Sequence, residues 1–108
     1  MAIQQITPIF LQYELLENPE AYFLLDVREP FEYQIASLQN SVLIPMNQIS
    51  ERLQELDKNQ PIVVICHHGV RSEQVAYYLV QQGFESIFNL SGGIHAWANA
   101  CDREMALY

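Results

Sequence analysis

The stretch IVVICHHGVRSE, residues 62–73, joins an apolar run to a short polar loop and then to a helix-forming segment. Residues 62–65 are consecutive aliphatic residues, which is typical of a strand buried on both faces of a parallel sheet. Ser72 is a good helix N-cap, and the apolar positions that follow it at helical spacing predict a helix over 72–82. This order places Cys66 at the carboxyl end of a strand and beside a helix N-terminus.

The rest of the chain alternates between strand-like and helix-like segments. Short apolar runs predict three further strands, at 22–27, 41–44 and 86–89. Helical patterns predict three further helices, at 9–17, 47–56 and 94–100. The first of these helices is preceded by Thr7 as N-cap and by Pro8 at its first turn. The alternation predicts an α/β fold, in which a small parallel β-sheet is flanked by helices on both faces.

Length and composition predict a single domain over residues 1–108, because no repeat or linker-like segment divides the chain. Half of the residues are hydrophobic and only 17% are charged, which excludes a disordered chain. The formal net charge of −8 argues against nucleic acid and anionic membranes as partners. Neither a signal peptide nor a membrane span is predicted. The two cysteines form no C-x-x-C motif or disulfide framework, so we expect a reducing cytoplasmic location.

The surroundings of Cys66 favour a nucleophile. First-turn N–H groups, the positive end of the helix dipole and Arg71 would all stabilise an anion there, which favours a reactive thiolate. Gly69 allows the loop to curl so that its amides point inward. In the alternative interpretation, Cys66 is a small buried hydrophobic residue that ends a strand. The polar residues and the arginine that follow Cys66 favour the nucleophile.

Three motifs of this chain resemble those of one family. CHHGVRS at 66–72 resembles the active-site loop of single-domain rhodaneses, which are sulfurtransferases. LDVRE at 25–29, followed by EY at 32–33, resembles their early motif, and NLSGGIHAW at 89–97 resembles their late motif. The resemblance covers nearly the whole chain. Between the first two motifs, only Ile44-Pro45 remains of the family's usual His-Ile-Pro-Gly-Ala-x-Asn-Ile-Pro segment, a departure that affects a scaffold turn.

The resemblance implies a rhodanese-like fold and a sulfur transfer in two steps. The Cys66 thiolate takes the outer sulfur of a donor such as thiosulfate or a persulfide and itself becomes a persulfide. It then passes that sulfur to cyanide or to a thiol. A sulfur-carrier protein is a further expected acceptor, because the tail at 102–108 is similar to the ends of rhodanese domains fused to ubiquitin-like-protein adenylyltransferases. No cofactor is expected.

Cys66 is the expected catalytic residue. The expected substrate-binding residues are the rest of its loop and one arginine of the early motif: His67, His68, Gly69, Val70, Arg71, Ser72 and Arg28. We expect Arg71 to orient an anionic donor rather than to pair with a surface carboxylate. For Asp26 we favour a scaffold ion pair, which leaves the role of Arg28 open.

No metal site is expected at His67 and His68, because adjacent residues rarely converge on one ion and no Cys or His lies at a standard spacing from them. Gly92 and Gly93 are predicted to provide a tight turn and close packing, since no Lys-Ser/Thr follows them as a P-loop requires. A role for Cys101 in resolving a Cys66 intermediate stays open.

Loop length favours sulfur over phosphate chemistry. Four residues separate Cys66 from Arg71, whereas the related dual-specificity phosphatases use a Cys-x5-Arg loop that closes around a tetrahedral phosphate. A phosphatase or arsenate reductase of the same fold is therefore the enzyme alternative. The other alternative is a non-catalytic binding module, which Cys66 argues against because inactive relatives commonly lack this cysteine.

Overall fold

The computed structural model describes residues 3–108. Its centre is a five-stranded parallel sheet in the order β1-β5-β4-β2-β3. The strands are β1 (Gln4–Ile6), β2 (Phe23–Asp26), β3 (Val42–Leu43), β4 (Ile62–Ile65) and β5 (Ile87–Leu90). The helices are α1 (Pro8–Glu17), α2 (Pro30–Ile35), α3 (Val70–Gln81) and α4 (Gly93–Cys101), with 3-10 turns η1 (Met46–Glu51) and η2 (Leu53–Glu55). The predicted α/β class is confirmed.

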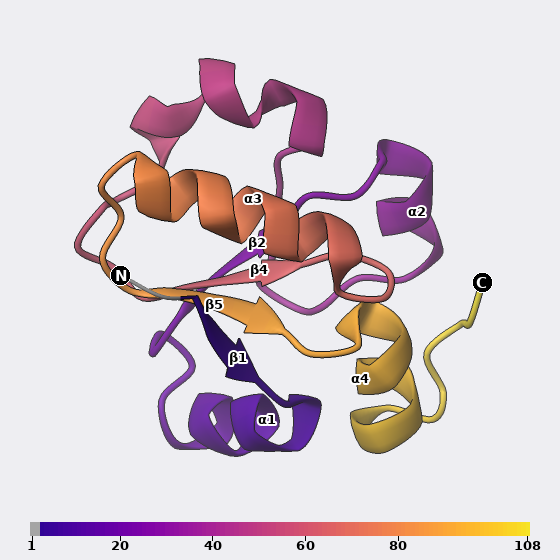
Figure 1. Ribbon diagram of the computed structural model, residues 1–108. Coiled ribbons are helices and arrows are strands. Elements are labelled where there is room, and N and C mark those ends of the chain that lie inside the picture. The colour runs from indigo at the N-terminus through magenta and orange to yellow at the C-terminus, as the bar shows by residue number, and fades with distance from the viewer. Residues whose placement is uncertain (1–2) are drawn as a thin grey trace.

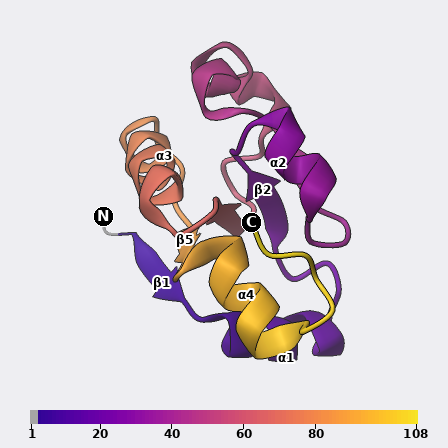
Figure 2. The ribbon, with the colours of Figure 1, turned by 90° about the vertical axis from the view of Figure 1, so that its right-hand side faces the viewer.

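Helices cover both faces of the sheet. Figure 1, and Figure 2 in a view turned by 90°, show α3 and the 3-10 turns on one side and α1 and α4 on the other. The central strand β4 is fully buried, and its residues alternate between the two cores. Ile62 and Val64 pack beneath α3, whereas Val63 and Ile65 pack against α1 and α4. Strand β4, which leads directly to Cys66, is therefore the element that both cores share.

The predicted strands are all present, and none of their ends moves by more than one residue. The predicted burial on both faces is wrong for β3, an edge strand in which Val42 is 40% exposed. The predicted start of α1 is confirmed, since Thr7 Oγ1 accepts a hydrogen bond from the Phe10 N–H. No helix among residues 3–108 is long and apolar enough to cross a bilayer.

The expected crossover helix at 47–56 is wrong. This segment forms η1 and η2, separated by Arg52 at φ −123° and ψ 20°. Its apolar residues recur every three or four positions, a spacing that 3-10 turns satisfy as well as an α-helix does. Ile49 and Leu56 are accordingly still buried in the core beneath α3.

Three other local features differ from expectation. Helix α3 begins at Val70 with Gly69 as its N-cap, so Ser72 lies inside the first turn rather than capping it. Two elements were not predicted: the edge strand β1, which is short and partly polar, and α2. The sequence does carry a signal for α2, namely Pro30 in the first turn and a capping box between Glu29 and Glu32.

Candidate active site

Cys66 follows β4 directly and lies below the first turn of α3. Its side chain is buried, with 1% of the residue exposed. The Gly69 N–H donates to Sγ at 3.1 Å and the Ser72 N–H donates to it at 3.3 Å. Both amides belong to the loop that was expected to curl around the sulfur. Their direction favours a negative charge at this position.

The Ser72 hydroxyl connects the sulfur to β5. The Cys66 thiol donates to Ser72 Oγ at 3.2 Å, and Ser72 Oγ in turn donates to Asn89 Oδ1. The Asn89 amide donates to the Gly69 carbonyl at 3.2 Å and to Gln5 Oε1 at 3.1 Å. Side chains from two strands therefore hold the loop in its curled shape.

Two glycines allow the backbone around the sulfur to pack closely. Gly69 has a φ of +97°, and a Cβ there would lie 3.2 Å from the Gly92 nitrogen. Gly93 has a φ of +65°, and a Cβ there would lie 2.4 Å from the carbonyl oxygens of both Cys66 and His67. The tight turn and close packing predicted for Gly92 and Gly93 are thus confirmed, and they seat the start of α4 against the loop.

Arg71 is paired with the buried carboxylate of Glu32. Its two terminal nitrogens donate to Glu32 Oε1 at 2.7 Å and to Oε2 at 2.9 Å. The Tyr108 hydroxyl also donates to Glu32 Oε2, at 3.0 Å. The hydrogen bond from Arg71 is the main reason that the pKa of Glu32 falls to about 2. Glu32 lies on α2, 39 residues before Arg71, so spacing along the chain did not reveal the partner.

Arg28 is completely buried. Its Nε and Nη2 donate to the Asp26 carboxylate, at distances down to 2.7 Å. Nη2 also donates to the Ala36 carbonyl, and Nη1 donates to the Glu32 carbonyl and the Tyr108 hydroxyl. A side chain with every nitrogen engaged and no exposed surface is not accessible to a substrate. This placement favours a scaffold role for Arg28, like the one expected for Asp26.

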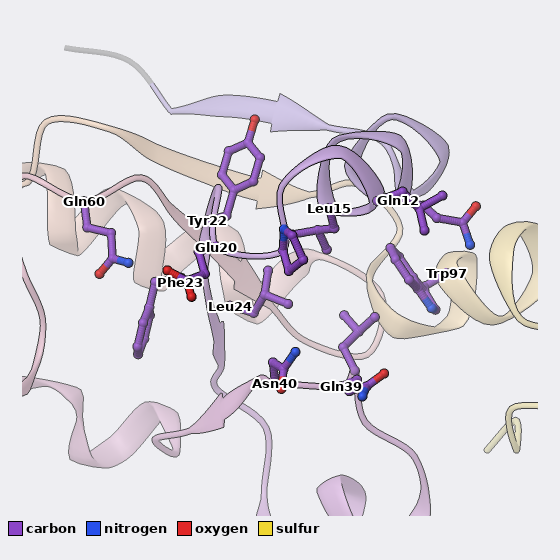
Figure 3. Close-up of a pocket in the computed structure, with 13 residues that line it drawn as sticks. Gln12, Leu15, Glu20, Tyr22, Phe23, Leu24, Gln39, Asn40, Gln60 and Trp97 are labelled. Carbon is purple, nitrogen blue, oxygen red and sulfur yellow. The ribbon is translucent and has the colours of Figure 1, made fainter.

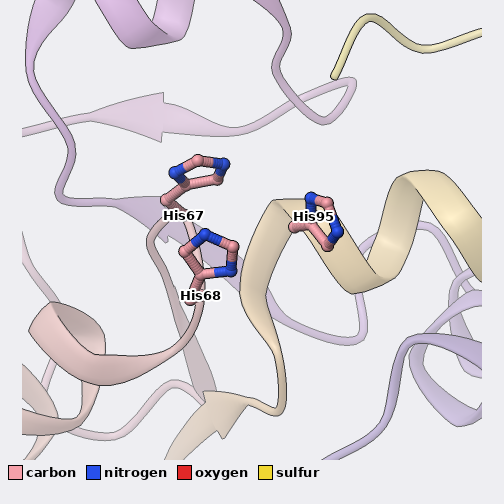
Figure 4. Close-up of side chains that lie close together, drawn as sticks. All are labelled: His67, His68 and His95. Carbon is pink, nitrogen blue, oxygen red and sulfur yellow. The ribbon is translucent and has the colours of Figure 1, made fainter. Parts of the chain in front are cut away.

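Both loop histidines lie beside a third histidine that the sequence did not connect to them (Figure 4). His95, on α4, has its ring centroid 6.0 Å from that of His67 and 5.1 Å from that of His68. The His67 ring also stacks on the Tyr108 ring, with centroids 3.9 Å apart. Burial, and then the charge of His68, lower the pKa of His67 below its ordinary value.

Neither the second cysteine nor the hollow beside Trp97 belongs to this site. Cys101 ends α4, on the order of 12 Å along the helix axis from the end that touches the loop. This placement does not support direct resolution of a Cys66 intermediate by Cys101. A hollow of about 780 Å³ lies between α1, the amino end of β2 and Trp97 (Figure 3). Cys66, by contrast, is at the carboxyl edge of the sheet.

A model of the rhodanese-like domain family matches residues 11–100. The chain belongs to this family. The thiosulfate sulfurtransferase GlpE of Pseudoalteromonas translucida is 36% identical over 100 residues, 93% of each chain. A sulfurtransferase of Allochromatium vinosum is 39% identical over 83 residues, 77% of this chain and 78% of that relative. The crystal structure of a rhodanese-like domain protein from Staphylococcus aureus superimposes with a TM-score of 0.84 at 33% identity, covering 98% of this chain and 99% of that one.

Three residues of this rhodanese-like site were not among the candidates from sequence: Asn89, His95 and Tyr108. Asn89 could have been found from sequence, since it lies near the carboxyl end of a predicted strand. Active sites of parallel sheets lie at that edge. His95 follows the glycine pair and could have been expected near the loop once that pair was assigned to close packing. Nothing in the pattern of the tail indicates that the Tyr108 ring would stack on His67.

Proposed function

We propose that this chain is a sulfurtransferase that carries a sulfane sulfur as a persulfide on Cys66. The observation that carries the proposal is the pair of N–H groups, from Gly69 and Ser72, that donate to Sγ at the start of α3. Membership of the rhodanese-like family and the names of the relatives support the same reaction. The proposal treats residues 1–108 as a single domain.

The proposed reaction has two displacements. The Cys66 thiolate attacks the outer sulfur of thiosulfate, the bond between the two thiosulfate sulfurs breaks, and sulfite leaves with the electron pair. Cys66 then carries a terminal, negatively charged sulfur. A cyanide ion or a thiolate attacks that sulfur, the persulfide bond breaks, and the Cys66 thiolate is restored. No general base is required, because the nucleophile and the leaving groups are anions.

The loop provides the proposed contacts to the transferred sulfur. The N–H groups of Val70 and Arg71 lie in the first turn of α3, where no intrahelical acceptor is available to them, and the terminal sulfur is their proposed ligand. His67 and His68 are the proposed side-chain contacts to the donor. Arg71 is a further proposed contact to the donor anion, through the guanidinium N–H groups that Glu32 does not use. Buried Arg28 is left out of donor binding.

The proposed donors are thiosulfate and small persulfides, and the proposed acceptors are cyanide, thiols and a sulfur-carrier protein. A reducing compartment such as the cytoplasm suits this chemistry, since Cys66 and Cys101 are both free thiols.

Intact mass after incubation with thiosulfate tests the proposal. The full chain should gain the mass of one sulfur atom, and cyanide should remove it as thiocyanate. Cys66→Ser should not gain this mass, because a serine hydroxyl is not ionised at neutral pH. Cys101→Ser is the matched control and should gain it as the full chain does. A sulfur gain in folded Cys66→Ser, or efficient hydrolysis of an aryl phosphate with no sulfur gain from any donor, would overturn the assignment.

A further inference from the structure

The chain contains three histidines, and all three meet at the opening of the Cys66 loop. One nitrogen of each ring can be chosen so that all three lie within 4.8 Å of one another. His67 and His68 come from the loop after β4, and His95 comes from the first turns of α4 (Figure 4). Histidine is the most common metal-binding side chain. Here the fold brings three histidines from two separate elements close together.

Two nitrogens of this histidine cluster are buried without a partner among residues 3–108. His67 Nε2 and His95 Nδ1 have no hydrogen-bond partner among the residues that the structure describes. A buried polar atom of this kind costs free energy unless something binds it. Both atoms belong to the three-histidine cluster, so a ligand that bound to them would remove this cost.

The backbone fixes this arrangement. The Ile94 N–H donates to the Cys66 carbonyl at 2.8 Å, and the His95 N–H donates to the His67 carbonyl at 3.1 Å. The missing side chain of Gly93 permits this contact, as described above. The position of His95 relative to the loop is therefore set by main-chain hydrogen bonds and not by the histidine side chains themselves. The exposed His68 is free to complete the set by a rotation of its side chain.

We propose that His67, His68 and His95 form a binding site for a divalent transition-metal ion, with Zn²⁺ as the representative ion. Neutral imidazoles suit Zn²⁺, Cu²⁺ and Ni²⁺, whereas Mg²⁺ and Ca²⁺ prefer oxygen ligands. Tetrahedral zinc with bonds of about 2.0–2.1 Å holds its nitrogens about 3.3 Å apart, so these nitrogens, which lie within 4.8 Å of one another, must move closer together when the ion binds. Three nitrogens leave a fourth position open for water or a small anion.

This proposal replaces the expectation that the loop histidines hold no metal. That expectation rested on spacing along the chain, and the docking of α4 supplies the third ligand from outside the loop. The site does not depend on sulfur transfer. The Cys66 sulfur makes hydrogen bonds to Gly69 and Ser72 inside the loop, and it is not one of the proposed metal ligands.

Titration of the full chain with Zn²⁺ in competition with a chromophoric chelator tests the site. We expect one ion per chain, and on addition of Zn²⁺ the ring-proton resonances of all three histidines should shift together. Co²⁺ in place of Zn²⁺ should give ligand-field absorption without the sulfur-to-cobalt charge-transfer band that a thiolate ligand produces. His68→Ala changes an exposed side chain, and His95→Ala changes a ligand on the other element. Each should weaken binding by at least about 10- to 100-fold, which is what loss of even an outer partner of a ligand costs.

Cys66→Ser and Cys101→Ser are the matched controls and should bind Zn²⁺ as the full chain does. The metal proposal therefore stands even if sulfur transfer is disproved. It is overturned if no stoichiometric binding is found. It is also overturned if binding survives both histidine substitutions, or if binding is lost with Cys66→Ser, which would assign the ion to the thiolate.

Discussion

Strands β2 and β4 end side by side, with Asp26 paired in register to Ile65, yet the loops that follow them differ in how their polar groups are satisfied. After β2, Asp26 and Arg28 have no exposed surface, and the nitrogens of Arg28 are all engaged. After β4, backbone amides point at a sulfur, and His67 Nε2 is buried without a partner among residues 3–108.

The difference separates a scaffold from a site. Polar groups that are fully paired inside the protein stabilise one conformation and have nothing left to offer a ligand. Polar groups that are aimed at one atom, or left without partners, are free to bind. Both loops lie at the carboxyl edge of the sheet, so position alone does not decide which of them carries the chemistry.

The largest effect is expected from removing the buried ion pair between Asp26 and Arg28, in the loop after β2. Arg28→Met leaves the Asp26 carboxylate buried and uncompensated, which should lower the free energy of unfolding by about 3–5 kcal/mol. Urea denaturation followed by circular dichroism measures this loss. Arg52→Met is the matched control, since Arg52 pairs with Glu55 on the surface and its removal should leave stability nearly unchanged. Equal unfolding midpoints for the two variants would show that the Arg28 pair is not a scaffold.

Changing the length of the β4 loop should damage chemistry more than stability. A glycine inserted between Val70 and Arg71 makes a Cys-x5-Arg loop and moves the donor amides relative to the sulfur. A misplacement of about 1 Å can cost ~100-fold in rate, and we expect a loss of that order in persulfide formation. Mass spectrometry of samples quenched at set times after addition of thiosulfate measures the rate of persulfide formation. A glycine inserted between Asn59 and Gln60, in an exposed turn, should leave the rate unchanged. Equal rates for both insertions would contradict the role of loop length.

The hydroxyl between the sulfur and β5 can be removed without changing the length of either loop. Ser72→Ala leaves Asn89 Oδ1 and the thiol each without their partner, which should lower the free energy of unfolding by about 1–3 kcal/mol. Ser50→Ala, at an exposed position, is the control for the loss of a hydroxyl. If the two variants are equally stable in urea, the link from sulfur to β5 does not hold the loop.

The smallest effect is expected from breaking the ion pair between Glu32 on α2 and Arg71 on α3. The folded-state pKa of Glu32 is lowered to about 2, chiefly by Arg71, so its ionised form stabilises the fold above its ordinary pKa of 4.5. That contribution is lost as the pH falls from 4.5 through about 2. Glu32→Gln should cost about 1 kcal/mol near neutral pH, since Arg71 is partly exposed, and the cost should shrink in acid. A difference between wild type and variant that does not depend on pH would assign the cost to packing.

Much of the fold follows from local pattern, whereas the site depends on contacts that the pattern does not contain. The buried strand before Cys66 and the capped start of α1 are visible in sequence because each depends on neighbouring residues. The pairing of Arg71 with Glu32 and the approach of His95 to His67 join distant parts of the chain. Local pattern can also be ambiguous. The segment 46–55 forms 3-10 turns instead of the predicted α-helix, because both helix types satisfy the same apolar spacing.

The hydrogen bonds from Cys66 to Asn89 run in a fixed direction. Both N–H groups of the Asn89 amide are engaged, with Gly69 and Gln5, so the amide presents its oxygen to Ser72. Ser72 has a single proton, which it gives to that oxygen while its own oxygen accepts from the thiol. A sulfur without a proton has nothing to donate, so the Ser72 hydroxyl is then able to donate either to Sγ or to Asn89 Oδ1. The proton on the sulfur therefore fixes the direction of a second group: a neutral thiol holds the Ser72 hydroxyl on Asn89, and a thiolate removes that constraint.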